Sequence, residues 1–392
     1  MSENSFTESE NSFTEVTNQS WFSRIGDSIK GILGGLAMVA VAFFLLFWNE
    51  GRAVKQYKTL KEGGKTVISV SADSVDAANA GKLLHVTGRA VTDATLTDPV
   101  FGVSANALRL KRVVTMYQWK ETSKSDTKEK LGGGTETTKT YSYSKVWSDR
   151  VISSSEFKVQ ADHQNPTSLP YEPSEQIAAV VTFGAFTLSP SLVYRINNFE
   201  PLPVSNDVSL PESLKNKVKR NDSGFYIGSD PSSSQIGDAR ISFMVAKPTE
   251  VSVIAAQVGK TFEPYRTKTS GNIELLQTGV HSAEAMIQQA QENNRNLTWI
   301  LRLVGFILML SGLNMMLRPL SVLASVVPIL GTIVGAGLGL VAFLLAALLS
   351  LVTIAIAWIV YRPLLGIVLI IIAVSLALVI KGKLKSAKVE KA

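Results

Sequence analysis

Long runs of apolar residues without charge constrain this chain more than any other feature of its sequence. Residues 31–48, 303–317 and 364–380 hold such runs, and residues 320–360 hold a much longer one. An α-helix rises about 1.5 Å per residue, so about 20 apolar residues cross the hydrocarbon core of a membrane. The sequence therefore predicts a membrane protein with several spanning helices.

Residues 31–48 are expected to form the first span, with Trp48 as an anchor at the membrane–water interface. A cleaved signal peptide is the alternative interpretation. The run begins late for a signal peptide, however, and it ends in the bulky FFLLFWNE rather than in small residues. We therefore expect a span that is retained.

The segment before the first span has two parts. Residues 20–33 place Trp21, Ile25 and Ile29 four residues apart, which indicates an amphipathic turn at the interface that leads into the span. Residues 1–19 contain SENSFTE twice and are polar and weakly acidic. This composition predicts a disordered N-terminal tail.

Residues 282–317 are expected to form a stalk helix that continues into the second span. Ser282 is a residue type that caps helix N-termini, and no Gly or Pro interrupts the segment before the apolar run. Arg302, near the start of that run, is expected to extend outward to the interface beside Trp299. Asn314 lies deeper, where an amide normally bonds to a neighbouring helix.

Residues 318–380 are expected to hold an interfacial segment and the third and fourth spans. Residues 321–360 are too long for one span of ordinary tilt, so they form either two spans or an interfacial stretch followed by one. Pro328 and the glycines after it are expected to mark the break. The last span is residues 364–380.

The distribution of basic residues predicts the orientation. The tail, residues 381–392, is rich in lysine, and basic segments beside spans favour the cytoplasmic side. Four spans then place the N-terminus in the cytoplasm as well, in agreement with Arg24 and Lys30 near the first span. The polar residues 49–281 lie outside, in a periplasm or a lumen; five spans would reverse both assignments.

Residues 49–281 are expected to form a β-rich domain. Residues 82–91, 108–121 and 139–152 alternate apolar or aromatic side chains with polar ones, as half-buried strands do. LGGGTET, residues 131–137, is expected to be the loop of an antiparallel pair. The predicted fold class is thus a membrane protein of α+β type, with four transmembrane helices and a large β-rich domain between the first and the second.

Enzymatic chemistry has no clear signature in this sequence. The chain has no cysteine, which excludes disulfides, thiolate catalysis and cysteine-ligated zinc. Its three histidines are scattered, and neither a phosphate-binding Gly-Lys-Ser/Thr loop nor a nucleophile elbow occurs. We therefore expect no catalytic residue, no metal and no cofactor. The basic tail follows an apolar run, which favours a membrane position over a nucleic-acid partner.

Small residues recur every four positions in two of the predicted spans. Such faces let helix backbones approach closely, within one chain or between chains, and they favour a homo-oligomer. The alternative is that glycine is simply common in spans. The predicted helix-packing residues are Gly31, Gly35, Gly331, Gly335, Gly339 and Asn314.

Several short motifs, taken in order, resemble the transmembrane protein 43 (LUMA) family. They are NEGRA (49–53), MYQW (116–119), HQNP (163–166), IGDARISF (236–243) and WIVYRPL (358–364). The resemblance implies four spans, a large non-cytoplasmic domain and self-association. Animal members lie in the endoplasmic reticulum and inner nuclear membrane with lamins and emerin. No catalytic residue carries over.

Among the residues that match the family, His163, Asp238 and Arg240 form a candidate ligand cluster. The leading functional hypothesis is a self-associating scaffold in a bacterial inner membrane, whose outer domain binds proteins or lipids. Its expected partners are membrane lipids, further copies of the chain, and other membrane or envelope proteins. The alternatives are a membrane-tethered hydrolase or lipid-modifying enzyme, and a transporter component.

Overall fold

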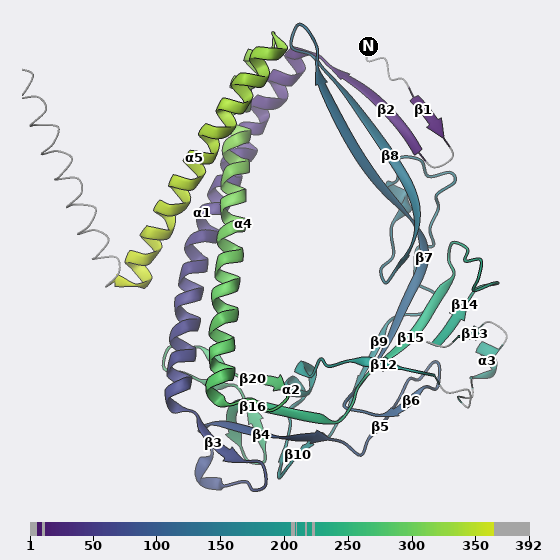
Figure 1. The fold of residues 1–392 in the computed structure, drawn as a ribbon, viewed down its shortest axis with the longest axis vertical. Helices are drawn as coiled ribbons and strands as arrows, with labels where there is room; N and C mark the ends of the chain where they lie inside the picture. The colour runs from purple at the N-terminus through teal and green to yellow at the C-terminus, as the bar shows by residue number, and fades with distance from the viewer. Residues whose placement is uncertain are drawn as a thin grey trace, which may run out of the picture.

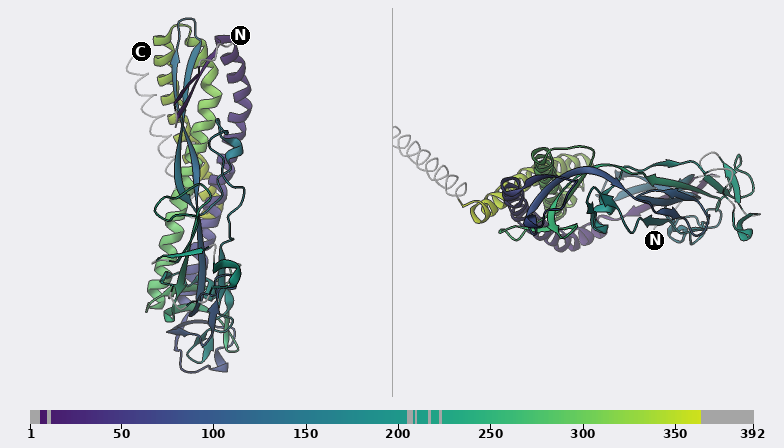
Figure 2. Two further views of the ribbon diagram at one scale, coloured as in Figure 1. Left: turned by 90° about the vertical axis from the view of Figure 1, so that its right-hand side faces the viewer. Right: turned by 90° about the horizontal axis from the view of Figure 1, so that it is seen from below.

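Three long helices form one side of the molecule and an elongated β-rich region forms the other (Figure 1). The structure is a computed structural model that describes residues 6–9, 12–204, 208, 210–215, 218–221 and 224–363. Seen along the other two axes, the molecule is elongated and narrow (Figure 2). The helices are α1 (Trp21–Thr66), α2 (Pro190–Arg195), α3 (Glu212–Lys215), α4 (Ala283–Ala324) and α5 (Pro328–Tyr361).

The first helix, α1, is longer than the span expected from the sequence. Ser20 caps it by accepting a hydrogen bond from the Ser23 amide at 3.3 Å. The helix continues past Trp48 to Thr66, so its 46 residues extend about 69 Å. The β-rich domain, expected from residue 49, therefore begins only after Thr66, because nothing breaks the helix where the polar residues begin.

The stalk helix expected from the sequence is confirmed. Ser282 caps α4 by accepting a hydrogen bond from the Ala285 amide at 3.2 Å. The helix enters the apolar run without a break. It also passes the expected end of the second span, residue 317, and includes Pro319 before it ends at Ala324.

The chain breaks once within residues 321–360, at residues 325–327, and α5 follows as one helix. Pro328 lies in the first turn of α5, where its missing N–H breaks no helical hydrogen bond. The glycines after it lie inside the helix and do not interrupt it. The described part of the chain has three helices long and apolar enough to cross a membrane, so it does not support the predicted total of four. The predicted last span, residues 364–380, lies outside the described residues.

The larger of two main sheets has nine strands in the order β1-β2-β8-β7-β15-β14-β13, with β9 paired to β7 and β12 paired to β15. Its strands are β1 (Phe6–Ser9), β2 (Ser12–Gln19), β7 (Arg109–Glu129), β8 (Thr135–Ser148), β9 (Ser174–Ile177), β12 (Glu200–Leu202), β13 (Val218–Asn221), β14 (Gly224–Ile227) and β15 (Ala239–Ala246). The predicted pair of strands around LGGGTET is the β7–β8 hairpin.

The smaller sheet has seven strands in the order β11-β10-β4-β16-β17, with β3 beside β4 and β20 beside β16. Two short hairpins join β5 to β6 and β18 to β19. The strands are β3 (Ile68–Ser71), β4 (Leu83–Val91), β5 (Thr95–Thr97), β6 (Ser104–Asn106), β10 (Thr182–Phe183), β11 (Phe186–Thr187), β16 (Thr249–Val258), β17 (Thr261–Glu263), β18 (Tyr265–Arg266), β19 (Asn272–Ile273) and β20 (Leu275–Thr278).

Two buried clusters hold the β-rich region together and fix it to the helices. The main cluster takes side chains from both sheets, and the stacked rings of Phe101 and Phe225 belong to it. In the second cluster, Leu60 of α1 and Met286 of α4 pack with Ile273. Because these three side chains are almost fully buried, the lower ends of α1 and α4 are rigidly joined to the domain.

The β7–β8 hairpin extends far beyond the core. β7 has 21 residues, which at about 3.3 Å per residue span about 70 Å, the length of α1. Residues 120–129 are all polar or charged. We call residues 120–142 the arm. The arm reaches from the core to the far end of the helices (Figure 1).

The tip of the arm contacts the helices at that far end. Arg24, in the first turns of α1, forms an ion pair with Glu129 at 2.9 Å and donates hydrogen bonds to the Gly133 carbonyl and, at 3.0 Å, to the Ser325 hydroxyl. The amide of Gly132 donates to the carbonyl of Val326 at 3.1 Å. Residues between the first two spans were expected to stay at one end of the helices. The arm instead reaches the other end.

The N-terminal tail, expected to be disordered, forms strands. β2 pairs with β8 over all eight of its residues, and the hydroxyls of Thr14 and Thr140 lie 3.3 Å apart. The reason is tertiary: the arm offers an open strand edge whose N–H and C=O groups need partners. The composition of the tail does not reveal such an edge.

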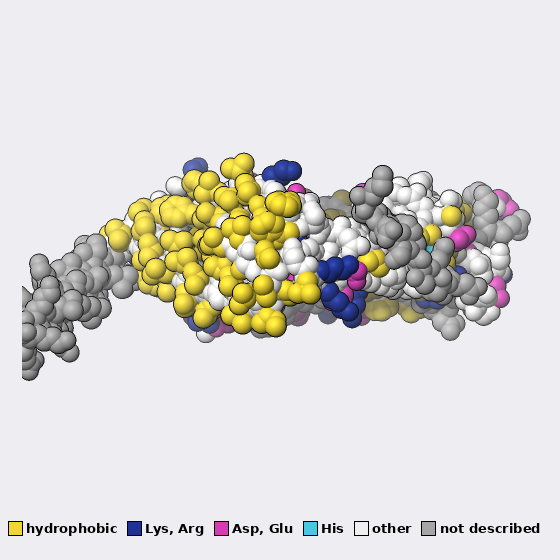
Figure 3. Space-filling model, turned by 90° about the horizontal axis from the view of Figure 1, so that it is seen from above, with side chains coloured by type: hydrophobic (Ala, Val, Ile, Leu, Met, Phe, Trp, Pro, Cys, Tyr) yellow, Lys and Arg dark blue, Asp and Glu magenta, His cyan; other side chains and the backbone are white. Residues whose placement is uncertain are grey.

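Apolar and polar surfaces are separated. Viewed from above, hydrophobic side chains gather over the helices, whereas the region toward the arm and the sheets is mostly polar (Figure 3). The exposed apolar residues of the helices include Phe44, Ile307 and Leu351. Large exposed apolar surfaces of this kind mark contact with a membrane or a partner.

Candidate functional site

Three helices meet at a buried ion pair directly after the first apolar run. The Glu50 side chain on α1 is fully buried and accepts hydrogen bonds from Arg302 of α4, at 2.7 and 3.0 Å. It also accepts one from the indole N–H of Trp358 on α5, at 2.8 Å. A buried carboxylate needs such partners, because an unpaired charge away from water is very costly. Glu50 thus joins α1, α4 and α5.

Arg302 lies beside Trp299, as expected, but its guanidinium turns to Glu50 within the helix bundle rather than outward. Its guanidinium lies 4.7 Å from the centre of the Trp299 ring and 5.9 Å from that of Trp358, while it also binds Glu50. Cation–π contacts of this kind stabilise a guanidinium that has lost most of its water. Arg302 is therefore a structural cation inside the helix bundle.

A second set of polar contacts lies beside the ion pair and links α1 to α4. The Asn49 amide donates to the carbonyl of Thr298 at 3.0 Å. Arg52 donates to the side chains of Asn294, at 2.9 Å, and Thr298, at 3.0 Å. Asn294 in turn donates to the Ala53 carbonyl at 3.0 Å. The NEGRA motif therefore acts as a polar junction between two helices.

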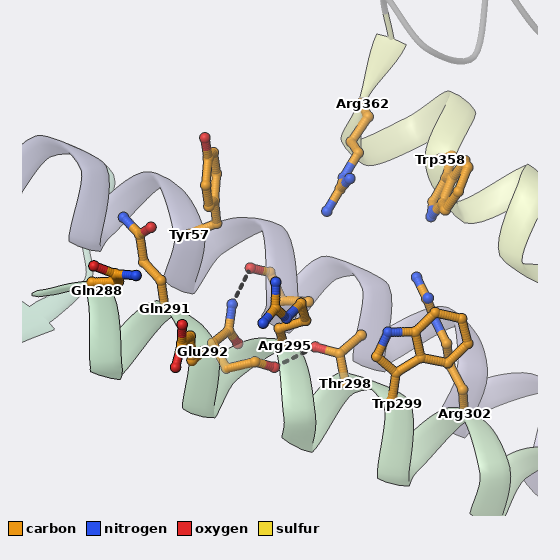
Figure 4. A pocket seen from close by; sticks show the side chains of 12 residues that line it. Tyr57, Gln288, Gln291, Glu292, Arg295, Thr298, Trp299, Arg302, Trp358 and Arg362 are labelled. Atoms are coloured by element: carbon orange, nitrogen blue, oxygen red, sulfur yellow. Dashed lines mark hydrogen bonds between the residues drawn. The ribbon is translucent and has the colours of Figure 1, made fainter.

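A hollow of about 500 Å³ opens next to this junction (Figure 4). We call it the interfacial hollow. It is rich in guanidinium and indole groups, which suit binding of an anion better than acid–base chemistry. Within the described residues, no group of His, Cys, Asp and Glu could hold a metal ion. The lining of the hollow includes Tyr57, Arg295, Trp299, Arg302, Trp358 and Arg362.

His163, a predicted ligand residue, has a packing role in the structure. It is buried, its ring stacks on Tyr143 with 3.8 Å between ring centres, and it meets the edge of Trp119 at 4.7 Å. Its Nδ1 lies 3.2 Å from the carbonyl of Val159. These contacts fill the surroundings of the imidazole and anchor the loop after β8.

Asp238 and Arg240 also have their own partners. Asp238 accepts hydrogen bonds from the Tyr226 hydroxyl at 2.5 Å and the Gln235 amide at 2.7 Å. Burial, followed by this hydrogen bond to Asp238, raises the pKa of Tyr226. The guanidinium of Arg240 lies 3.9 Å from the centre of the Trp147 ring. Each of the three residues thus has partners of its own among the described residues, and their service as one ligand site, on which the enzyme hypothesis depends, stays a prediction.

The glycines predicted to pack between helices differ in their surroundings. Gly35 packs closely, because a Cβ built on it would lie 2.6 Å from the carbonyl oxygen of Gly312 on α4. A Cβ on Gly31 or Gly339 would meet no atom within 4 Å. Gly35 and Gly312 therefore let α1 and α4 approach closely, whereas a packing role between chains for Gly31 and Gly339 stays a prediction.

The remaining predicted packing residues lie near the α4–α5 turn or on the surface. A Cβ on Gly331 would be 2.7 Å from the Cα of Ser325, and one on Gly335 would be 3.1 Å from the hydroxyl of Ser321. Both glycines thus pack against the end of α4. Asn314 is exposed in the single chain.

Glu50 and Gly312 were not predicted from the sequence. A signal existed for Glu50: an acidic residue directly beside the end of one apolar run, and Arg302 at the start of another, are expected at similar depth. Charges at similar depth in a membrane normally pair. For Gly312 the signal was a glycine inside the apolar run 303–317, since small residues let helices in a membrane approach closely.

The long apolar helices, the polar junction between them and the attached sheets define a multi-span membrane protein of α+β type. The sequence pattern described as transmembrane protein 43 matches residues 116–363. Transmembrane protein 43 of Rattus norvegicus is 34% identical over 381 residues, 94% of each chain, and that of Homo sapiens is 34% identical over 396 residues, 98% of each. The homolog of Drosophila melanogaster is 28% identical, over 87% of this chain and 92% of its own. No solved structure matches. The chain belongs to the transmembrane protein 43 family.

Proposed function

We propose that this protein is a self-associating membrane scaffold that presents its β-rich domain for protein or lipid binding. The observation that carries the proposal is the position of the arm. Its polar residues lie along the same length of the molecule as the apolar runs of the helices, and its tip contacts their far end. In this proposal a lipid-embedded helix and a water-exposed strand thus lie at the same depth in the membrane.

One chain alone cannot keep its apolar helices in lipid and its polar arm in water. A charged side chain in the hydrocarbon core costs about 2.5–3.5 kcal/mol or more, and an open strand edge leaves backbone groups without partners there. Residues 120–129 carry six charged side chains, including Asp126, and residues 122–128 are exposed. Copies of the chain arranged with their helices toward lipid and their arms toward a shared aqueous interior meet both requirements. This arrangement motivates the proposed self-association.

The proposal also concerns the sides of the membrane on which the β-rich domain and the N-terminal tail lie. The arm brings residues of the β-rich domain to the end of α1 at which the N-terminal tail lies. We propose that an aqueous interior connects the two sides of the membrane at this position. The bacterial inner membrane is the proposed location, on the grounds of the cysteine-free sequence and the large soluble domain.

The proposal predicts a large particle in native membranes. Protein extracted directly into lipid nanodiscs should show, by mass photometry, a protein mass of several times the 42.4 kDa of one chain. This mass should not change on dilution, because a stable scaffold dissociates slowly. Particles that contain one chain only would contradict the proposal.

A matched pair of single cysteines tests the aqueous interior. Asp126→Cys in the arm should react with a membrane-impermeant maleimide, because the proposal places it in water. Leu351→Cys in α5, which is 66% exposed in one chain, should stay unreacted because lipid covers it. Equal protection of both thiols in intact membranes would argue against an aqueous interior.

A further inference from the structure

The side chains that line the interfacial hollow carry more positive than negative charge. Arg302 is neutralised by Glu50. Arg295 and Arg362 line the same hollow, and neither has a carboxylate partner in the part of the chain that the structure describes. Glu292 is the one acidic residue among the described lining residues. A group of cations with this excess favours an anionic ligand.

The lining of the hollow is typical of the depth at which membranes present their head groups. Trp299 and Trp358 line it, and Trp48 lies at the end of the adjacent apolar run. Trp is enriched at the membrane–water interface, where the ring is apolar and its N–H reaches polar groups. The two arginines thus face the layer that contains lipid phosphates.

A second cavity continues from the hollow. It has a volume of about 710 Å³, shares Tyr57 and Arg362 with the hollow, and is lined further by Val54, Lys58, Lys61, Tyr361 and Pro363. Its lysines add to the positive charge near the two arginines. Exposed apolar side chains of α4, among them Ile300 and Leu303, follow directly after Trp299. Cations beside an exposed apolar helix surface fit an amphiphile with an anionic head and acyl chains.

We propose that the interfacial hollow binds the phosphate of an anionic phospholipid. Arg295 and Arg362 hold the phosphate by charge-assisted hydrogen bonds, and Trp299 and Trp358 flank the head group. The acyl chains lie along the exposed apolar side chains of α4, such as Ile300 and Leu303. The site lies within one chain, so single-chain particles would contradict the scaffold proposal without changing the lipid binding expected here.

Native mass spectrometry of the full chain in a neutral detergent tests this assignment. Phosphatidylglycerol should remain bound, whereas phosphatidylcholine with the same acyl chains should dissociate, because its choline group offsets the phosphate charge. The variant Arg295→Gln/Arg362→Gln should weaken binding of phosphatidylglycerol by about tenfold or more. Both side chains are at least partly exposed, so thermal unfolding should be unchanged.

The matched control is Arg266→Gln/Lys268→Gln, which removes two positive charges from exposed residues of the β-rich domain. It should leave the lipid affinity unchanged. Excess inorganic phosphate should not displace phosphatidylglycerol. Displacement by phosphate would identify a soluble anion as the ligand and overturn the lipid assignment. Equal affinity of wild type and the double arginine variant would overturn the site itself.

Discussion

Replacing Glu50 with glutamine is expected to destabilise the helix bundle by about 3–5 kcal/mol, because Arg302 is then left almost buried without a counter-charge. Side-chain exposure is 0% for Glu50 and 16% for Arg302, so water compensates little of the lost carboxylate. The hydrogen bond from the Trp358 indole is weakened as well. Unfolding of the purified protein in detergent, followed by circular dichroism across a denaturant series, measures the loss.

Two comparisons separate this effect from a general loss of charge. Asp27→Asn removes a carboxylate whose pair with Lys30 is exposed and 3.9 Å long, so a change of about 0.5 kcal/mol or less is expected. Glu50→Gln/Arg302→Gln should recover part of the lost stability, because no unpaired charge remains. A Glu50→Gln variant as stable as Asp27→Asn would show that the ion pair does not hold the helices together.

Replacing Gly312 with valine is expected to separate α1 from α4. A Cβ at this position would lie 2.6 Å from the Gly35 carbonyl oxygen and 2.9 Å from the Val39 side chain. A backbone oxygen cannot move out of the way unless the helix moves, so we expect a loss of at least about 1–3 kcal/mol in the same unfolding measurement.

Gly337→Val is the matched control for this variant. Gly337 also lies inside an apolar helix, and a Cβ there meets no atom within 4 Å. The intrinsic change in helix propensity from glycine to valine is the same in both variants, so the difference in stability reports the contact between α1 and α4. Equal stability of the two variants would mean that these helices do not approach closely at Gly312.

The apolar helices and many strands could be predicted because their signals are local. A run without charge, such as residues 31–48, and an alternating segment, such as residues 108–121, each fix one element through the burial of their own side chains. Ser282 marked the start of α4 for the same reason. The end of α1 was missed because the helix continues as a polar helix after its apolar run, and residue 49 marks only the change in composition.

The position of the arm could not be predicted, because it depends on a contact between distant residues. Arg24 and Glu129 are 105 residues apart, and their pairing has no local pattern. Glu50 and Arg302 are 252 residues apart, and only their similar depth beside two apolar runs indicates the pair. The candidate cluster of His163, Asp238 and Arg240 stays a prediction. The contacts that the structure gives these residues are aromatic packing and turn geometry in the β-rich domain.

The central claim is that the N-terminal tail and the arm lie together at the end of the apolar helices farthest from the core of the β-rich domain. Disulfide formation in the otherwise cysteine-free chain tests it most directly. Thr14→Cys/Thr140→Cys should form a disulfide in intact membranes, because the two hydroxyls lie 3.3 Å apart on paired strands. Thr14→Cys/Thr278→Cys should not form one. Two free thiols in the first variant, reactive from opposite sides of the membrane, would contradict the account.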